Sequence, residues 1–335
     1  MEYRRLGNSG LQVSVIGLGT NNFGVVLSGG RMDYKQTEKV LKQAMDEGIN
    51  FIDTSNTYGS GLAEEFIGKA LKGSRDKVLL ATKVASTIGE GPNQHGASRK
   101  HIMEQVEISL KRLQTDYLDL YQIHYYDPFT PVEESLRAMD NLVTHGKVRY
   151  IGCSNFAAWQ VAEAVSITKM LGLEPLVCVE TEYSMLKRGI EKELLPCCQR
   201  YQLGIIPYFP LASGFLTGKY KRGNPAPKGT RLSIQHKRAE TTLTEENFDL
   251  LEKLEFFVGE RGHSLTELAF AWLLAHPEIS SVIAGVTKPE QIVANAKAAD
   301  WHLSIEEMEE LNGILQTLAH TWDTPTAHMH PFRPW

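Results

Sequence analysis

The fold is decided by a repeating unit that is clearest in residues 117–153, which read YLDLYQIHYYDPFTPVEESLRAMDNLVTHGKVRYIGC. Apolar runs at Tyr117–His124 and Val148–Cys153 predict two strands, and the amphipathic stretch between them predicts a helix. Thr130-Pro131-Val132-Glu133 predicts a capping box with proline at the first helical position. Gly146 stands where the end of that helix favours a left-handed residue. The segment therefore predicts a strand–helix–strand unit.

The same unit recurs along the chain, because short apolar runs alternate with stretches whose apolar residues lie three and four positions apart. The predicted strands are Val15–Leu18, Asn50–Asp53, Lys77–Lys83, Tyr117–His124, Val148–Cys153, Leu176–Thr181, Gly204–Tyr208 and Ser281–Ala284. The helical stretches start near Lys35, Leu62, Ser98, Pro131, Ala157, Lys187, Thr244 and Pro289. Eight alternations without a domain linker predict an α/β fold, a parallel sheet closed into a (β/α)8 TIM barrel.

Three segments fall outside this repeat, within what we expect to be a single barrel domain over residues 1–335. Residues 2–14 predict an N-terminal β-hairpin that turns at Asn8-Ser9-Gly10 and caps the barrel. Ser213–Thr242, after the seventh strand, is long for an ordinary connection, and long loops at that end of a barrel are usually functional. One extra C-terminal helix is predicted after the eighth unit, followed by a tail over 320–335.

Local signals mark the ends of three further helices. Ser264-x-x-Glu267 and Ser304-x-x-Glu307 predict capping boxes at two helix starts. Gly48, like Gly146, stands where a helix end favours a left-handed residue.

The composition is typical of a globular protein, with 42% hydrophobic residues and a net charge of −5 over 335 residues. Mild acidity disfavours a nucleic-acid-binding protein, and no apolar run approaches the ~20 residues of a membrane span. The N-terminus has no apolar segment behind its charges, which disfavours a secretory signal. Cys153, Cys178, Cys197 and Cys198 lack C-x-x-C spacing. We therefore expect a cytoplasmic protein with reduced thiols and with neither a nucleic-acid nor a membrane partner.

Several common binding motifs are missing. Gly17-Leu18-Gly19 is followed by Asn22 where a dinucleotide-binding G-x-G-x-x-G motif has its third glycine. The sequence also lacks a G-x-x-x-x-G-K-[ST] phosphate loop, an H-E-x-x-H zinc motif and a G-x-S-x-G elbow. His328 and His330 in the tail are too few for a metal site, so we expect no bound metal.

Four ionisable side chains lie at or just beyond the ends of three neighbouring predicted strands: Asp53, Tyr58, Lys83 and His124. Because chemistry in this fold gathers at the carboxyl ends of the strands, we expect them to face one mouth of the barrel. A phenol is a poor acid at pH 7, but a nearby ammonium favours the phenolate and lowers the phenol pKa. Asp53 would keep Lys83 charged and aimed, and His124 would donate a hydrogen bond to a carbonyl oxygen. Such a set can protonate an oxygen as negative charge develops on it.

Each of these residues also has a structural interpretation that the sequence leaves open. Asp53 can cap a turn, Tyr58 can be a packed aromatic residue, Lys83 a charge at a strand end and His124 a satisfied histidine. A purely structural role for all four residues would require four independent coincidences at neighbouring strand ends. The functional interpretation is therefore favoured.

From about Leu6 to Leu318 the sequence resembles the aldo-keto reductase superfamily, including its bacterial reductases and the reductase-like β subunits of potassium channels. Four ordered segments carry the resemblance: GINFIDT with Tyr58-Gly59 (48–59), DYLDLYQIH (116–124), GKVRYIGCSNF (146–156) and PLASGFLTGKY (210–220). The ordered set is far more specific than any one motif.

The resemblance implies a barrel that binds NADPH, with NADH as the second candidate, and that transfers hydride between the nicotinamide and the carbonyl of a small aldehyde or ketone. The catalytic tetrad falls on Asp53, Tyr58, Lys83 and His124, with the tyrosine as general acid. The implied cofactor contacts are Gly19, Thr20, Asp53, Ser154, Asn155, Glu180, Tyr208, Leu211, Ser213, Gly214, Leu216, Lys219, Gly285, Thr287, Lys288, Gln291 and Asn295. Ser154 and Asn155 would hold the carboxamide, Tyr208 would stack on the ring, and the segments after the last two strands would hold the phosphates.

Two residues depart from the family pattern. Glu180 stands where the family usually has a glutamine, and a carboxylate accepts hydrogen bonds but donates none unless it is protonated. Lys288 alone supplies charge where members often carry an arginine, and a lysine lacks the bidentate fork of arginine. We therefore expect looser selection of the cofactor's 2′-phosphate.

Two other functions stay open. A cofactor-binding, redox-sensing subunit with little turnover would share the same pattern. A Schiff-base lyase would use Lys83 as its nucleophile in the same fold. Phe23, Trp159, Trp322 and Trp335 are candidates for an apolar substrate pocket, and association into a homo-oligomer is compatible with the sequence.

Overall fold

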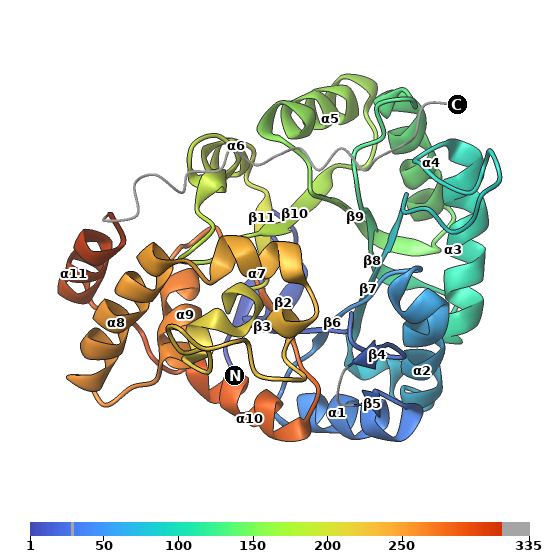
Figure 1. The fold of residues 1–335 in the computed structure, drawn as a ribbon. Coiled ribbons are helices and arrows are strands. Elements are labelled where there is room, and N and C mark those ends of the chain that lie inside the picture. Colours follow the sequence, from blue (N-terminus) through green and yellow to red (C-terminus); the bar gives the residue numbers. More distant parts are fainter. Residues whose placement is uncertain (28–29, 317–335) are drawn as a thin grey trace.

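A computed structural model describes residues 1–27 and 30–316 of the chain. Its eight parallel strands form a closed barrel in the order β10-β11-β12-β3-β6-β7-β8-β9, with helices as an outer ring (Figure 1). These strands are β3 (Ile16–Gly19), β6 (Phe51–Asp53), β7 (Leu79–Val84), β8 (Leu118–Ile123), β9 (Val148–Ser154), β10 (Leu176–Glu182), β11 (Gly204–Tyr208) and β12 (Val282–Gly285). All eight predicted strands form, and the predicted TIM barrel is confirmed.

Two hydrophobic layers hold the barrel together. The larger layer lies between the strands and the surrounding helices. The smaller layer fills the barrel interior and includes Phe51, Leu120 and Ile206 from three strands. Leu6 and Val13 of the N-terminal hairpin belong to this inner cluster, so the hairpin closes the barrel at the amino ends of the strands. The carboxyl ends are thereby left as the open mouth.

The hairpin consists of β1 (Tyr3–Arg5) and β2 (Gln12–Ser14), which pair antiparallel as predicted. A second two-stranded sheet of β4 (Val26–Leu27) and β5 (Gly30–Arg31) was not predicted. Its strands are too short to show a period of alternating side chains.

The outer helices follow the strands in the expected order. They are α1 (Tyr34–Asp46), α2 (Leu62–Ala70), α3 (Arg99–Leu113), α4 (Val132–Thr144), α5 (Ala158–Leu171), α6 (Leu194–Tyr201), α7 (His236–Thr242), α8 (Glu245–Gly259), α9 (Leu265–Leu274), α10 (Pro289–Ala298) and α11 (Ile305–Leu315). The capping boxes at Ser264 and Ser304 are confirmed, and Gly48 and Gly146 have left-handed φ angles of 80° and 72°. The extra C-terminal helix is α11.

Two local predictions were wrong. The start of α4 has no capping box, because Pro131 is the N-cap and the Thr130 hydroxyl donates instead to Asp127 Oδ2 at 2.6 Å. The sixth helix begins at Leu194 rather than near Lys187, since a short 3₁₀ turn intervenes.

The long segment after β11 is more regular than the predicted loop. It contains the 3₁₀ turns η4 (Ala212–Thr217) and η5 (Arg231–Ser233) and then α7, which occupies the end of the expected Ser213–Thr242 loop. The tail over 320–335, with Trp322, His328, His330 and Trp335, lies outside the described residues.

Candidate active site

The four predicted tetrad residues come from the carboxyl ends of three neighbouring strands. Asp53 is the last residue of β6, Lys83 lies near the end of β7, and His124 follows β8 directly. Strand register places Asp53 opposite Ala81 and Lys83 opposite Gln122. Tyr58 opens the 3₁₀ turn η1 (Tyr58–Gly61) after β6, so the same loop brings it to the same mouth.

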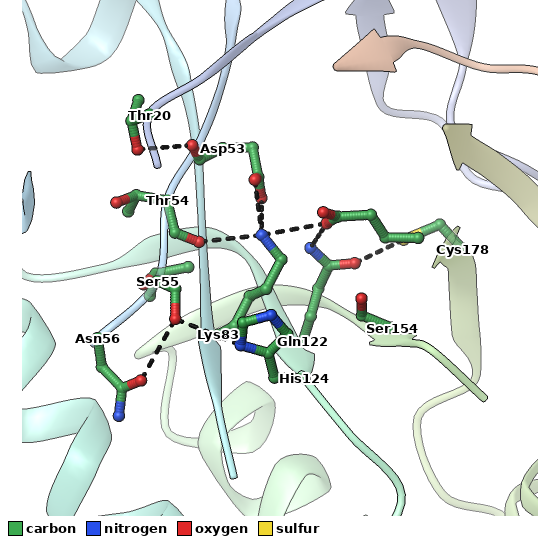
Figure 2. Close-up of polar contacts among 12 residues, drawn as sticks. Thr20, Asp53, Thr54, Ser55, Asn56, Lys83, Gln122, His124, Ser154 and Cys178 are labelled. Atoms are coloured by element: carbon green, nitrogen blue, oxygen red, sulfur yellow. Dashed lines mark hydrogen bonds and ion pairs between the residues drawn. The ribbon is translucent and has the colours of Figure 1, made fainter. Parts of the chain in front are cut away.

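The Lys83 ammonium is the centre of the cluster. Its Nζ donates to both carboxylate oxygens of Asp53, at 2.5 and 2.6 Å, and to the Thr54 carbonyl at 3.1 Å (Figure 2). The Lys83 residue is fully buried and Asp53 is 2% exposed. A charged pair this deeply buried persists only when its hydrogen bonds are made, which these contacts provide.

The charge state of the pair follows from burial and from a third group. Burial alone would lower the pKa of Lys83, but the carboxylates of Asp53 and Glu180 outweigh it and raise that pKa above its usual range. Burial raises the pKa of Asp53 to about 8, Glu180 adds to the rise, and Lys83 opposes it. Lys83 is therefore an ammonium at neutral pH, as expected for an ion-paired lysine.

The pKa of the Tyr58 phenol is raised, whereas the sequence analysis predicts that the nearby Lys83 ammonium lowers it. Lys83 Nζ lies 5.4 Å from the centroid of its ring and does lower the pKa of the phenol. Burial of the hydroxyl is the larger effect, however, and the net pKa is raised, with Asp53 and Glu180 adding to the rise. In this state the phenol is neutral and holds its proton.

His124 is fixed by hydroxyl groups on one side and by stacking on the other. Its Nδ1 lies 3.0 Å from Ser86 Oγ and 3.4 Å from Ser55 Oγ, and its ring stacks on Tyr125 with centroids 4.5 Å apart. When Ser86 donates to Nδ1, the imidazole carries its proton on Nε2 and can donate it to a ligand. The rings of Tyr58 and His124 meet edge to face at 6.1 Å.

Gln122 is a site residue that the sequence analysis missed. Its Nε2 donates to Glu180 Oε2 at 2.7 Å, and the same carboxylate oxygen lies 3.2 Å from Lys83 Nζ. The alternation of side chains along β8 was a usable signal, since Gln122 and His124 are two residues apart and share a face.

The expected carboxamide pair lies beside this cluster, since Ser154 is the last residue of β9 and Asn155 follows it directly. Asn155 has a left-handed φ of 58°, and its Nδ2 donates to Ser154 Oγ at 3.0 Å and to the His124 carbonyl at 3.1 Å. The Tyr208 hydroxyl, from β11, donates to Asn155 Oδ1 at 2.7 Å. These residues are thus linked to one another and, through the His124 backbone, to the tetrad.

The residues expected at the pyrophosphate lie in and before η4. Ala212, Ser213 and Gly214 have consecutive positive φ angles of 45°, 61° and 87°, and Leu211 and Leu216 flank them. The backbone N–H groups of this turn donate to carbonyls within it, from Ala212 to Phe209 at 2.9 Å and from Gly214 and Leu216 to Leu211 at 2.8 and 3.2 Å. The Lys219 side chain crosses Gly214 so closely that a Cβ there would collide with its ammonium.

Of the residues expected at the adenosine end, Gly285 ends β12, Thr287 and Lys288 lie between β12 and α10, and Gln291 and Asn295 lie in α10. The Gln291 carboxamide oxygen accepts from the backbone N–H groups of Thr287 at 2.7 Å and Lys288 at 3.2 Å. Asn295 is buried one turn further along α10. Beside Gly285, Asn21 Oδ1 is buried without a hydrogen-bond partner among the described residues.

Gly19 and Thr20 connect the first strand of the barrel to the tetrad. Gly19 is opposite Asp53 in the β3–β6 register. The Thr20 hydroxyl donates to the Asp53 carbonyl at 2.8 Å.

Two arginines of the long segment after β11 were not singled out individually. Arg231 donates to Asn22 Oδ1 at 3.1 Å, and Arg238 binds both oxygens of Glu182 at 2.8 and 3.1 Å. Both guanidinium groups lie within 5 Å of the Phe209 ring centroid, at 4.8 Å for Arg231 and 4.5 Å for Arg238. The segment is therefore tied across the mouth to the loop after β3.

The aromatic residues that were candidates for an apolar pocket lie in different environments. Phe23 is fully buried in the core, whereas Trp159 is 60% exposed and meets Tyr126 edge-on at 5.5 Å. Among the described residues, no helix is long and apolar enough to cross a membrane, and no group of three metal-ligating side chains occurs.

Comparison with known proteins gives consistent matches over nearly the whole chain. The model of the Aldo/keto reductase family matches residues 15–316. The uncharacterized oxidoreductase YrpG of Bacillus subtilis (strain 168) is 41% identical over 94% of this chain and 96% of its own. The aldo-keto reductase YhdN of the same organism is 35% identical over 94% of each chain. A probable voltage-gated potassium channel subunit beta of Oryza sativa subsp. japonica is 38% identical over 95% of this chain and 97% of its own.

Proposed function

The chain belongs to the aldo/keto reductase family of oxidoreductases, and we propose that it transfers hydride from NADPH to the carbonyl carbon of an aldehyde or ketone, with Tyr58 as general acid. The observation that carries this proposal is the buried contact of 2.5 Å between Lys83 Nζ and Asp53 Oδ1 beside Tyr58 and His124. A fixed ammonium next to a phenol stabilises negative charge on the phenolic oxygen as its proton leaves.

The residues of this chain fit a nicotinamide dinucleotide. Asn21 Oδ1 is a buried acceptor that lacks a partner within 1–27 and 30–316, and a nucleotide hydroxyl or amine would satisfy it. The backbone N–H groups of Thr287 and Lys288 converge on one oxygen, that of Gln291, in the way they would converge on a phosphate oxygen at a helix start. Lys288 would add one positive charge there.

When bound, the nicotinamide supplies the hydride. His124 Nε2, carrying a proton, would orient the substrate oxygen. Tyr58 would give its proton to that oxygen as charge develops, and Lys83 would stabilise the phenolate that remains. Asp53 holds the ammonium in place throughout. Arg231 and Arg238 would keep the segment after β11 across the mouth and so limit the entry of water.

The test is a panel of aldehydes, ketones and sugars assayed with NADPH and with NADH by absorbance at 340 nm. We expect turnover of at least one class of carbonyl, with NADPH preferred. Asp119→Asn, which breaks the ion pair with Arg75 away from the mouth, serves as a control that keeps activity. Binding of NADPH without turnover of any carbonyl would contradict a reductase function.

A second candidate is a cofactor-binding subunit with little turnover. It is favoured by the names of relatives described as probable voltage-gated potassium channel subunits beta, in Oryza sativa subsp. japonica and Arabidopsis thaliana. The same panel separates the two functions, because this candidate requires tight NADPH binding with a negligible kcat.

A Schiff-base lyase is disfavoured by the charge of Lys83. Its raised pKa keeps the amine protonated, and a protonated amine is not a nucleophile. Borohydride trapping of a carbonyl compound on Lys83 would reverse this conclusion.

A further inference from the structure

Glu180 brings a second carboxylate to the Lys83 ammonium. It lies on β10, opposite Ser154 of β9, and is 3% exposed. Its Oε2 lies 3.2 Å from Lys83 Nζ, while Asp53 contacts the same nitrogen at 2.5 and 2.6 Å from β6. Gln122 donates to Glu180 Oε2 at 2.7 Å and so holds this carboxylate against the ammonium.

We propose that Glu180 is a second counter-ion of Lys83, and that the Asp53–Glu180 pair binds one exchangeable proton whose loss favours the cationic, oxidised nicotinamide over the neutral, reduced one. The inference rests on the proposed function, because it requires a nicotinamide nucleotide in this mouth.

The net charge of the buried site depends on whether its two carboxylates are both ionised. With both carboxylates ionised, the trio of Asp53, Lys83 and Glu180 has a net charge of −1 in a buried site. Binding of one proton by the pair makes the trio neutral, which removes the cost of burying an unbalanced charge. The pKa of Asp53, raised by burial and by Glu180 to about 8, places this exchange near neutral pH.

The other titratable groups around the trio do not account for the proposed proton exchange. Burial raises the pKa values of the Tyr58, Tyr125 and Tyr208 phenols and of the Cys178 thiol, so these groups stay neutral. Glu182 at the same mouth is paired with Arg238, Arg231 donates to Asn22, and the His124 imidazole faces Tyr58 and Tyr125. None of these side chains is altered by the substitution of Glu180, so a Glu180 variant changes the charge of the trio alone.

Glu180 lies next to the proposed binding site of the nicotinamide carboxamide. Of the residues we propose for the carboxamide, Ser154 ends the adjacent strand β9 and Asn155 follows it, and the Asn155 backbone N–H donates to the Glu180 carbonyl at 2.9 Å. A nicotinamide held there lies close to the trio. Because charges in a buried site are weakly screened, the ionised trio would stabilise the positive oxidised ring and leave the neutral reduced ring nearly unaffected.

Glu180→Gln removes the negative charge of the Glu180 side chain and changes the shape of that side chain little. The amide oxygen still accepts from Gln122 and Lys83, but the trio becomes a neutral Asp53–Lys83 pair with no second carboxylate. Glu64→Gln is the matched control, because Glu64 is a fully buried carboxylate paired with Arg112 and bonded to Thr82 rather than to Lys83.

The measurement is the dissociation constant of NADP⁺ and of NADPH, determined by fluorescence titration between pH 6 and pH 9 at constant ionic strength. The 2′-phosphate titrates in both nucleotides, so its contribution cancels in the ratio of the two constants. In the wild type we expect the ratio Kd(NADPH)/Kd(NADP⁺) to rise about tenfold over this range. We expect the ratio to be nearly independent of pH in Glu180→Gln and to follow the wild type in Glu64→Gln.

Three outcomes overturn the inference. A ratio independent of pH in the wild type means that no coupled proton exists, and an unchanged rise in Glu180→Gln means that Glu180 does not carry it. Failure of the wild type to bind either nucleotide rejects the proposed function itself, and the inference with it. If Glu180→Gln does not fold by circular dichroism, calorimetry of the wild type in two buffers decides, because NADP⁺ must release more protons than NADPH on binding near pH 7.

Discussion

The ring of Tyr58 meets the ring of His124 edge to face, with centroids 6.1 Å apart and planes inclined at 76°. The two residues come from the loops after β6 and β8, and β7 with Lys83 lies between those strands. The contact therefore joins a phenol and an imidazole at the mouth of the barrel, and under the proposed function a substrate oxygen would receive its proton between them.

Replacing Tyr58 by phenylalanine removes the proposed acid while keeping the ring. We expect Tyr58→Phe to lower kcat by at least ~10²-fold, the usual scale of a positioned general acid. NADPH binding, followed by fluorescence titration, should be unchanged, because the hydroxyl serves the proton transfer. A kcat close to that of the wild type with a carbonyl substrate would refute this role.

The charge at the start of α10 is expected to select the phosphate of the cofactor. Lys288→Ala should weaken NADPH binding more than NADH binding, by ~1–3 kcal/mol, the scale of a charge-assisted contact. Lys297→Ala, at the exposed far end of the same helix, is the control and should change neither affinity. Equal weakening of both cofactors by Lys288→Ala would show that Lys288 does not bind the 2′-phosphate.

The segment Ser213–Thr242 should close on the cofactor. Its contacts with the barrel include the buried side chains of Phe215 and Leu216 and the hydrogen bonds of Arg231 with Asn22 and of Arg238 with Glu182. A bound pyrophosphate would add backbone contacts near Ser213. We expect hydrogen exchange in its peptides to slow with saturating NADPH, while peptides of α3 exchange at an unchanged rate. Unchanged exchange in this segment, with binding shown independently, would make it a plain connector.

Asp53 should make the stability of the ligand-free protein depend on pH. Its pKa is about 8 in the folded chain and about 3.9 in an unfolded one, so the folded state binds more protons across this window. The free energy of unfolding then falls as the pH rises from about 4 to about 8. Thermal unfolding at several pH values should show a shallower fall for Asp53→Asn than for the wild type, and an unchanged fall for Asp119→Asn. Parallel curves for all three proteins would contradict the raised pKa.

The start of α9 allows a test of local stability. The Ser264 hydroxyl accepts from the Glu267 backbone N–H at 3.2 Å, and Glu267 Oε2 accepts from the Ser264 backbone N–H at 2.8 Å. Ser264→Ala should lower the free energy of unfolding by ~1 kcal/mol, the usual cost of losing an N-cap. Ser166→Ala, in the exposed middle of α5, removes the same atom without a cap and should not destabilise the protein. Urea unfolding measures both, and equal effects would argue against the cap.

The barrel and the ends of its strands follow from local patterns in the sequence. Alternation between apolar runs and amphipathic stretches is a local property, so the eight strands and the capping boxes at Ser264 and Ser304 could be predicted residue by residue. The placement of Asp53 and Lys83 near strand ends also followed from the sequence, because parallel strands deliver their last residues to one mouth.

Which distant side chains contact one another depends on the tertiary structure. Glu180 reaches Lys83, and Arg231 reaches Asn22, across 97 and 209 positions of chain, which no local pattern specifies. Competition between partners also decided the start of α4, where Asp127 binds the Thr130 hydroxyl that a capping box would have used. Burial raised the pKa of Tyr58 despite the nearby ammonium. Sequence periodicity fixes which face of an element is buried, whereas the contacts and charges within that buried face depend on how distant elements meet.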